Sequence, residues 1–345
     1  MTSHLRTGIL LLVVVALTAY AGAADPPAPK KKKAPKEPRK ELPTYLTPES
    51  APPDFQIQGE FLGDLAGKKL GCQVISDGDG NFRCVFLPGG LPGAGSDNKD
   101  RVEGKGKTNG DKTDLSAGTT YAATISADGQ TIEGGTTNGQ SFTLHKVHRK
   151  SPEEGAKPPP GAIVLFDGTN GDAWENPHID EQRHLIMAGT KTKRKFQDFT
   201  LHLEFYLPYK PTAHEQERAN SGIYIQDRYE VQVLDSFGLP GEFNECGALY
   251  RQVKPLVNMC FPPLTWQTYD IDFQAARFDE SGKKTKPAVV TVRQNGVLVQ
   301  DHTELKDKTG GGQKEGPQPG PIQLQGHNNP VFYRNIWIID KSNPT

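Results

Sequence analysis

Short runs of alternating apolar and polar residues make up much of the chain after residue 54. In one run, Leu201, Leu203 and Phe205 alternate with His202 and Glu204. Because successive side chains of a strand point to opposite faces, this pattern predicts a strand with one buried face and one polar face. Turns rich in Gly, Asp and Asn separate the runs, and no apolar stripe has the 3.6-residue period of a helix over a convincing length. The pattern predicts an all-β protein.

The predicted strands fall into two groups. Short strands are expected at 55–58, 73–75, 82–86, 121–125 and 141–145, and longer ones at 200–207, 222–226, 229–234, 267–273, 288–294, 297–301, 321–325 and 331–339. The pair Asn295-Gly296 predicts a two-residue hairpin, because both residues accept a positive φ. The longer strands suit a two-sheet sandwich, preceded by a smaller β domain.

Composition agrees with this picture and adds the boundaries. The chain has 345 residues, of which 34% are hydrophobic, 37 are Gly and 28 are Pro, which suits short strands and turns. Segment 25–53 is rich in Pro and Lys and predicts a disordered linker, and segment 149–160 predicts a stiff Pro-rich one. The remaining segments are a leader at 1–24, a small β domain at 54–148 and a larger domain at 161–340.

The first residues have the order of a secretory signal peptide. Basic Arg6 precedes an apolar run from Ile9 to Leu17, and small residues follow through Ala24. The apolar run is shorter than the ~20 residues that span a bilayer, so we expect cleavage, no remaining membrane span, and export to the periplasm or cell surface. Seven basic residues between Lys30 and Lys40 could give weak contact with an anionic envelope, or only a solvated spacer.

Charge and cysteines limit the partners and the covalent framework. The formal net charge of -1 gives no case for a nucleic-acid partner. Four cysteines in an exported chain predict disulfides, and the pairings Cys72–Cys84 and Cys246–Cys260 keep each bond within one domain, although four cysteines allow three pairings. Neither pair has the C-x-x-C spacing of a structural zinc site.

Polar residues recur at every second position of three strands. His202 lies with Glu204 on one face, Glu230 pairs with Gln232, and the run 323–327 aligns Gln323, Gln325 and His327. These faces could simply be the wet side of an antiparallel sandwich. They could also form a site.

Separated motifs of the C-terminal half favour a site, because they resemble a known family. The motifs are Val164-Leu165-Phe166-Asp167-Gly168, Asn220-Ser221-Gly222-Ile223-Tyr224, Tyr229-Glu230-Val231-Gln232-Val233-Leu234-Asp235, Cys246-Gly247-Ala248-Leu249-Tyr250, Trp266-Gln267-Thr268-Tyr269-Asp270, Asn295-Gly296 and Arg334-Asn335-Ile336-Trp337. Their order over about 180 residues resembles the 3-keto-disaccharide hydrolase domain family. The resemblance implies a concanavalin-like jelly roll with a sugar site on its concave face, and cleavage of glycosides oxidised to a ketone at C3.

The resemblance also implies which residues carry the reaction. The family's YEVQ signature falls on 229–232, its NSG on 220–222 and its late His on His327. Gly326 departs from the acidic residue that many relatives carry before that His. Trp174 resembles the Trp of the family's opening segment, although a divergent loop follows it.

The chemistry leaves several catalytic assignments open. A ketone at C3 makes the C2 hydrogen acidic, so a base can remove it while the C1 substituent leaves. Glu230 or His327 could be the base, or Glu204, Glu230 and His327 could hold a divalent metal ion that polarises the ketone. Glu204 and Glu230 could instead be the carboxylate pair of a direct glycosidase. The partner in each case is an oxidised disaccharide or glycoside.

Further side chains could contact the sugar. The candidates for hydroxyl binding or stacking are Asn220, Gln232, Gln325, Tyr250, Arg251 and Trp174, with Tyr224 and Trp266 as further aromatic residues. For Trp266 and Trp337 core packing is favoured, and Arg334 is expected to pair with a carboxylate. Because this kind of sandwich also serves in recognition, the alternative is a non-catalytic carbohydrate-binding or cell-surface adhesion module.

Overall fold

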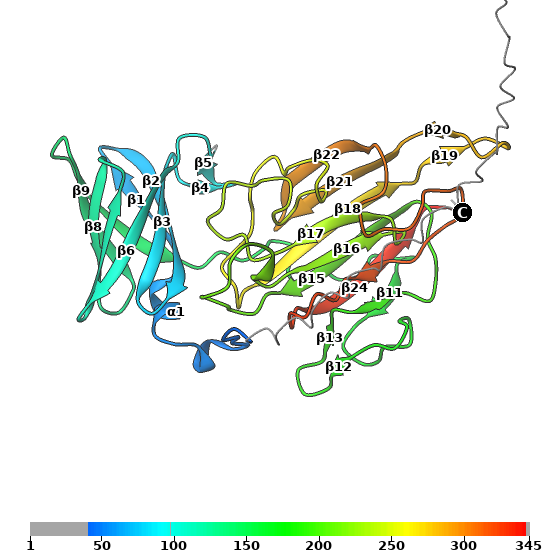
Figure 1. Cartoon of the computed structure of the whole chain (residues 1–345), viewed down its shortest axis with the longest axis horizontal. Coiled ribbons are helices and arrows are strands. Elements are labelled where there is room, and N and C mark those ends of the chain that lie inside the picture. The colour runs from blue at the N-terminus through cyan, green and yellow to red at the C-terminus, as the bar shows by residue number, and fades with distance from the viewer. Residues whose placement is uncertain (1–40, 97, 343–345) are drawn as a thin grey trace, which may run out of the picture. The chain divides into compact units, whose positions relative to one another are not determined.

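The computed structural model describes residues 41–96 and 98–342. Two β bodies follow one another along the chain, a closed barrel and then a two-sheet sandwich (Figure 1). Residues from Leu42 onward form one compact unit. No described helix is long and apolar enough to cross a membrane. The predicted leader at 1–24 and the first part of the predicted linker lie outside the described residues.

The barrel closes on itself through eight antiparallel strands. Their order around the barrel is β1 (Gly59–Leu65), β10 (Ser141–Val147), β9 (Thr131–Thr136), β8 (Tyr121–Ile125), β7 (Lys112–Ala117), β6 (Val102–Asn109), β3 (Asn81–Pro88) and β2 (Lys68–Gly78). Closure leaves no unpaired edge. Apolar side chains such as Phe61, Phe86 and Phe142 fill the interior.

The sandwich consists of a larger and a smaller antiparallel sheet. The larger has the order β12 (Ile179–Asp180), β13 (Leu185–Met187), β24 (Phe332–Asp340), β15 (Phe199–Tyr206), β18 (Trp266–Gln274), β21 (Ala288–Gln294) and β22 (Val297–Leu305), with β11 (Ile163–Phe166) also on β24. The smaller has the order β14 (Thr190–Lys191), β23 (Gln323–Leu324), β16 (Ser221–Ile225) and β17 (Tyr229–Val233). These two sheets confirm the predicted all-β jelly-roll class.

The remaining elements are short. They are η1 (Pro48–Ser50), α1 (Asp54–Ile57), η2 (Glu215–Glu217), the pair β4 (Leu91–Pro92) and β5 (Gly95–Ser96), and the pair β19 (Arg277–Phe278) and β20 (Lys284–Lys286). The predicted strand at 55–58 is therefore wrong, because α1 occupies most of it. The described part of the predicted linker is also ordered: Tyr45 and Tyr209 exchange two backbone hydrogen bonds of 2.9 Å.

The alternation in the longer strands correctly predicted the core. Leu201, Leu203 and Phe205 of β15 are buried in the same cluster as Val231 and Val233 of β17. The two sheets thus face each other with these side chains. Polar residues at the intervening positions of both strands therefore point away from the core, on opposite sides of the sandwich.

Several barrel strands were not predicted, and β6 shows why. Its inward positions include Gly104 and Gly106 rather than apolar residues. A Cβ on Gly106 would come within 2.6 Å of Leu115 Cδ2, so the neighbouring strand fills the space that a side chain would need. Without apolar residues at alternate positions, the strand leaves no periodic signal.

The predicted disulfides are absent, because the structure carries all four cysteines as free, buried thiols. In the barrel, Cys84 is paired with Val74, so Cys72 is only its diagonal neighbour across β2 and β3. Diagonal partners lie about 7–8 Å apart, beyond the usual separation of bridged cysteines. Burial raises the pKa of the Cys84 thiol to about 12.

The pair in the sandwich is buried as well. The Cys260 thiol donates to the Leu234 carbonyl at 3.4 Å, and the Cys246 sulfur lies 3.2 Å from the Tyr269 hydroxyl. Each thiol therefore has a polar partner in the core. The two sulfur atoms also interact with each other, through a hydrogen bond and not a disulfide.

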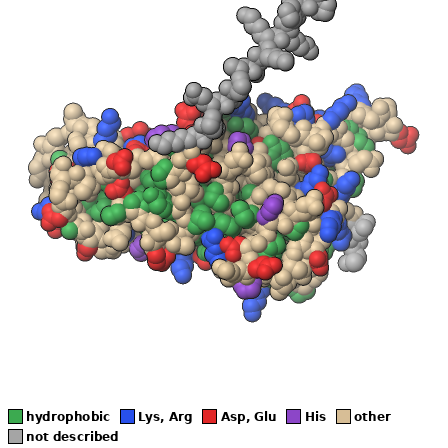
Figure 2. Space-filling model, turned by 60° about the horizontal axis from the view of Figure 1, so that its bottom comes forward, with side chains coloured by type: hydrophobic (Ala, Val, Ile, Leu, Met, Phe, Trp, Pro, Cys, Tyr) green, Lys and Arg blue, Asp and Glu red, His purple; other side chains and the backbone are tan. Residues whose placement is uncertain are grey.

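Acidic and basic side chains mix on the surface. On the face drawn in Figure 2 neither sign gathers into one large patch. This mixture agrees with the near-zero net charge.

Candidate active site

A row of four side chains crosses the smaller sheet on the face turned away from the core. Lys191 of β14 is paired with Gln323 of β23, Gln323 with Tyr224 of β16, and Tyr224 with Glu230 of β17. Directly paired residues of neighbouring strands point to the same face. We call these four residues the polar row.

A second row runs beside it. The amide of Gln325 donates to the Gly222 carbonyl at 2.8 Å, and Gly222 is paired with Gln232 of β17. These positions are two residues from members of the polar row, so they share its face. The structure thus brings Glu230 and Gln232, which the alternation placed on one face of their strand, together with Gln325 of another predicted strand.

Glu230 is an ionisable group at one end of the polar row, on the edge strand β17. It is only 3% exposed, and burial raises its pKa to about 7, a rise that a hydrogen bond with Tyr224 partly opposes. Its backbone amide donates to Thr309 Oγ1 at 3.0 Å. A carboxyl group that is half ionised near neutral pH is suited to both taking up and returning a proton.

The absence of a side chain at Gly222 makes room for this carboxylate. A Cβ at Gly222 would lie 2.3 Å from Glu230 Oε1. The glycine therefore fixes where the carboxylate can be, and any larger residue would displace it.

Two polar atoms on this side of the sheet are buried without a hydrogen-bond partner. They are Gln325 Oε1 and Asn220 Oδ1. The Asn220 amide donates to the Gln216 carbonyl, and Gln232 Nε2 donates to Gln216 Oε1 at 2.9 Å, so Gln216 links Asn220 to Gln232. Buried acceptors without partners are rare and costly, and hydroxyl donors of a sugar would satisfy them.

Tyr250 and Arg251 lie beside Glu230, on the loop that follows β17. The Tyr250 amide donates to the Glu230 carbonyl at 3.0 Å. The guanidinium of Arg251 lies over the Tyr250 ring, 5.4 Å from its centroid, and Arg251 is exposed. Both predicted sugar contacts are therefore within the neighbourhood of Glu230.

At the other end of the polar row the surface is hollowed into a cleft of about 560 Å³. Its lining residues are Glu175, Asn176, Gly189, Thr190, Lys191, Asp227, Gly311, Gln313, Gln323 and Gly326. Gly311 lies between the cleft and Tyr224, since a Cβ at this position would come within 2.8 Å of Tyr224 Oη.

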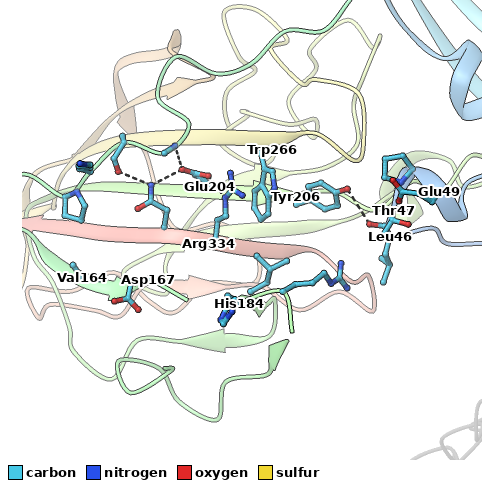
Figure 3. Close-up of a pocket in the computed structure, with 18 residues that line it drawn as sticks. Leu46, Thr47, Glu49, Val164, Asp167, His184, Glu204, Tyr206, Trp266 and Arg334 are labelled. Carbon is cyan, nitrogen blue, oxygen red and sulfur yellow. Dashed lines mark hydrogen bonds and ion pairs between the residues drawn. The ribbon is translucent and has the colours of Figure 1, made fainter. Parts of the chain in front are cut away.

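Glu204 lies elsewhere, on the outer face of the larger sheet. Figure 3 shows it beside Arg334, Trp266 and Tyr206. Arg334 Nε donates to Glu204 Oε2 at 2.6 Å, the amide of Gly155 donates to Oε1 at 2.6 Å, and Asn335 Nδ2 donates to Oε1 at 2.8 Å. Both carboxylate oxygens are thus occupied by protein donors.

The charges around Glu204 hold it ionised. Burial alone would raise its pKa, but hydrogen bonds from His202, Asn335, Gly155 and Arg334 lower it to about 2. Burial alone would lower the pKa of His202, but Asp270 and Glu204 raise it to about 9. A carboxylate fixed in this way is a poor proton acceptor near neutral pH.

These contacts fasten the predicted interdomain linker to the sheet. Arg334 Nη2 donates to Glu154 Oε1 at 2.9 Å, and Asn335 Nδ2 donates to the Ala156 carbonyl at 2.9 Å. Ser151 Oγ and Thr268 Oγ1 are 2.7 Å apart. The segment therefore packs along β15, β18 and β24 instead of standing free.

A larger cleft of about 870 Å³ adjoins Glu204. Figure 3 shows Val164, Asp167 and His184 across from Arg334 and Trp266. The guanidinium of Arg334 lies 3.8 Å from the centroid of the Trp266 ring and covers it. Glu204 is engaged by protein donors, and hydrogen bonds with Thr169 lower the pKa of Asp167, a second carboxyl group of this cleft. We therefore place the candidate active site at Glu230, whose pKa is raised.

Two other predicted site residues are not where the sequence put them. Trp174 is 0% exposed, and its indole donates to the Leu165 carbonyl at 2.8 Å, so it is a core residue and not a sugar contact. His327 is exposed in the loop after β23, because the strand ends at Leu324 and the alternation stops there.

The predicted metal set does not form. Among residues 41–96 and 98–342, no group of three or more His, Cys, Asp or Glu side chains is placed to hold a metal ion. Glu204 and Glu230 lie on opposite outer faces of the sandwich, so Glu204, Glu230 and His327 cannot share one ion. The same separation excludes Glu204 and Glu230 as a glycosidase pair, which needs carboxyl groups within about 10 Å.

Several residues on the Glu230 side of the smaller sheet had no signal in the sequence. Lys191 belongs to a two-residue strand, Gln216 to the three-residue helix η2, and Thr309 to a Gly-rich segment far along the chain. None is part of an alternating run. Gln323 is different, because the alternating run 323–327 placed it on one face with Gln325. It is the only residue of the 560 Å³ cleft that the sequence pattern singled out.

Comparison with solved structures found proteins of Parabacteroides distasonis ATCC 8503, described as "putative glycosyl hydrolase". The first is 36% identical, covers 53% of this chain and 84% of its own, and gives a TM-score of 0.48. The second is 17% identical, covers 56% and 99%, and gives a TM-score of 0.38. No curated protein matches the sequence.

Comparison with protein families gives one match, over residues 161–339, to the 3-keto-alpha-glucoside-1,2-lyase-like domain. The matched residues begin just before β11 and end within β24, so they span both sheets of the sandwich and include Glu230 and Tyr224. The match confirms the resemblance found in the sequence motifs. This chain belongs to the family of 3-keto-alpha-glucoside-1,2-lyase-like domains.

Proposed function

We propose that the protein is an exported enzyme that cleaves glycosides whose sugar carries a ketone at C3, with Glu230 as the base. The observation that carries the proposal is the buried Glu230 carboxyl, whose pKa is raised to about 7, beside Tyr224 on the polar face. Family membership supplies the substrate class.

The reaction begins at C2 of the oxidised sugar. The ketone makes the C2 hydrogen acidic, and ionised Glu230 takes it as a proton. The electrons of the C–H bond form a double bond between C1 and C2, while the bond from C1 to the glycosidic oxygen breaks. The proton on Glu230 is then available to the departing oxygen. Water adds across the double bond, hydroxyl to C1 and hydrogen to C2, so that the net change is hydrolysis.

Tyr224 is the donor nearest to this chemistry. Burial and the neighbouring Glu230 carboxylate raise the pKa of its hydroxyl, so it stays protonated over the working range. A protonated hydroxyl can donate to oxygen atoms on which negative charge develops during the elimination. Gln325 and Asn220, each with an unpartnered acceptor, would bind sugar hydroxyls.

Elimination fits this site better than direct glycoside hydrolysis. Direct hydrolysis uses two carboxyl groups on either side of the bond. The second candidate, Glu204, is on the far face and is held by Arg334. An elimination needs one base of suitable pKa, which Glu230 provides.

Export is part of the proposal and is supported by the leader alone. The order of a basic residue, an apolar run and small residues within 1–24 is that of a signal peptide. The periplasm or cell surface is the expected location.

The test compares the wild type with Glu230→Gln on 3-keto-trehalose and methyl 3-keto-α-glucoside. We expect sugar release by the wild type and a loss of at least a hundredfold in kcat/KM for the variant, with substrate binding retained. Glu304→Gln, an exposed position on β22, is the matched control and should keep full activity. If the wild type binds these sugars and releases none, the chain is a carbohydrate-binding module instead.

A further inference from the structure

The polar cleft next to Tyr224 has no role in the proton transfer described above. It contains Lys191 and Gln323, which form the end of the polar row opposite Glu230. Neighbouring strands are about 4.8 Å apart, so two spacings, about 10 Å, separate Glu230 from Gln323. That separation suits two linked sugar rings, one at Glu230 and one in the cleft.

The lining of the cleft indicates what it can bind. Every lining residue is polar, charged or glycine, and none is aromatic or a large aliphatic residue. The amide groups are those of Asn176, Gln313 and Gln323, and the charged groups are those of Glu175, Lys191 and Asp227. Such a surface offers hydrogen bonds to many hydroxyls and no apolar contact for an aromatic aglycone.

The charged groups of the cleft remain available to a ligand. Lys191 Nζ lies 3.8 Å from Glu175 Oε2, and both side chains are more than 40% exposed. Burial raises the pKa of Asp227, an effect that Lys191 opposes. A loose, exposed ion pair of this kind contributes little to stability, so it can exchange partners at low cost.

We propose that this cleft is the leaving-group subsite, and that it selects a sugar as the leaving group over an apolar or small aglycone. The inference rests on the proposed function, because it assumes that the oxidised ring is bound at Glu230. It assigns Lys191 and Gln323 to substrate selection and leaves the proton transfer to Glu230.

The experiment measures two substrates with the full chain. Lys191→Ala and Gln323→Ala should lower kcat/KM for 3-keto-trehalose by about tenfold each, and change kcat/KM for methyl 3-keto-α-glucoside less than twofold. Lys105→Ala, at an exposed position on β6 of the barrel, is the control and should change neither value. Equal losses of kcat/KM on both substrates, or no loss on either, would contradict the assignment of the cleft as the leaving-group subsite.

A binding measurement separates this inference from the proposed function. Calorimetry with Glu230→Gln should show tighter binding of 3-keto-trehalose than of methyl 3-keto-α-glucoside, and Lys191→Ala in that background should reduce the difference by about tenfold. If the wild type cleaves neither substrate, the proposed function fails, and this binding measurement alone tests whether the cleft binds the second sugar ring. Equal affinities for the two sugars would then reject the cleft as a sugar-binding subsite.

Discussion

Glu204 and Glu230 lie on opposite faces of the sandwich, each at a polar position of a strand whose alternate residues fill the shared core. Glu204 is ionised and saturated with donors, with a pKa lowered to about 2, while Glu230 has a pKa raised to about 7. Two carboxylates that look equivalent in the sequence thus have opposite electrostatic environments. One fastens a segment of chain, and the other is suited to proton transfer.

The pH dependence of activity should report Glu230. Because the base must be ionised, kcat/KM should rise with pH through about 7 and reach a plateau above it. Tyr224→Phe removes the hydrogen bond that lowers this pKa, so the rise should move to higher pH. The measurement is a kcat/KM profile from pH 5 to 9, and a profile that is flat across this range would argue against Glu230 as the base.

The burial of Glu230 should also appear in stability. Its pKa is raised in the folded protein. Below about pH 4.5 the carboxyl group is protonated in the folded and the unfolded protein and costs no stability, and above that its ionisation destabilises the fold as pH rises through 7. Glu230→Gln should therefore be more stable than the wild type at pH 8, by on the order of 3 kcal/mol, and equal to it near pH 4. Urea unfolding at both pH values measures this, and a difference independent of pH would contradict the raised pKa.

Gly222 should be a positioning residue. Gly222→Ala puts a Cβ where Glu230 Oε1 now lies and should lower kcat/KM at least tenfold by moving the carboxylate. The control is Gly310→Ala, because nothing lies within 4 Å of a Cβ at Gly310. A readout beyond activity is the pH profile, in which the rise should shift for Gly222→Ala alone.

Glu204 should matter for stability and not for chemistry. Glu204→Ala removes the ion pair with the half-buried Arg334 and the hydrogen bond from Asn335, and it should cost about 3 kcal/mol in urea unfolding at pH 7. Since the pKa of Glu204 is lowered in the folded protein, its contribution to stability is present above about pH 4.5 and is lost as the pH falls toward 2. Activity of the folded variant should remain within threefold of the wild type, and a large loss of kcat with unchanged stability would return Glu204 to the catalytic machinery.

The cysteines provide a covalent test. Four buried thiols should be inert to a thiol reagent in the native protein and should all react after unfolding without reductant. Two or zero reactive thiols in the unfolded protein would instead show the disulfides that cysteine spacing predicted. Mass spectrometry after alkylation counts them directly.

The sequence by itself determined the all-β class, most strands of the sandwich, and the face on which each of their residues lies. It could do so because the period of two is a local property: the burial of Leu201 requires that His202 and Glu204 point the other way. The Asn295-Gly296 hairpin was equally local, and both residues have a positive φ in the structure. The order of the separated motifs indicated the family, which the match over residues 161–339 confirms.

Only the tertiary structure decided which polar faces meet. Alternation says that Glu204 and Glu230 both point away from a core, but whether two strands belong to one sheet or to facing sheets depends on pairings between residues far apart in sequence. The pairing of β14, β23, β16 and β17 put Lys191, Gln323, Tyr224 and Glu230 in one row. The larger sheet carried Glu204 to the other side, where it holds the linker. Burial, which sets the pKa values of both carboxylates, followed from those pairings.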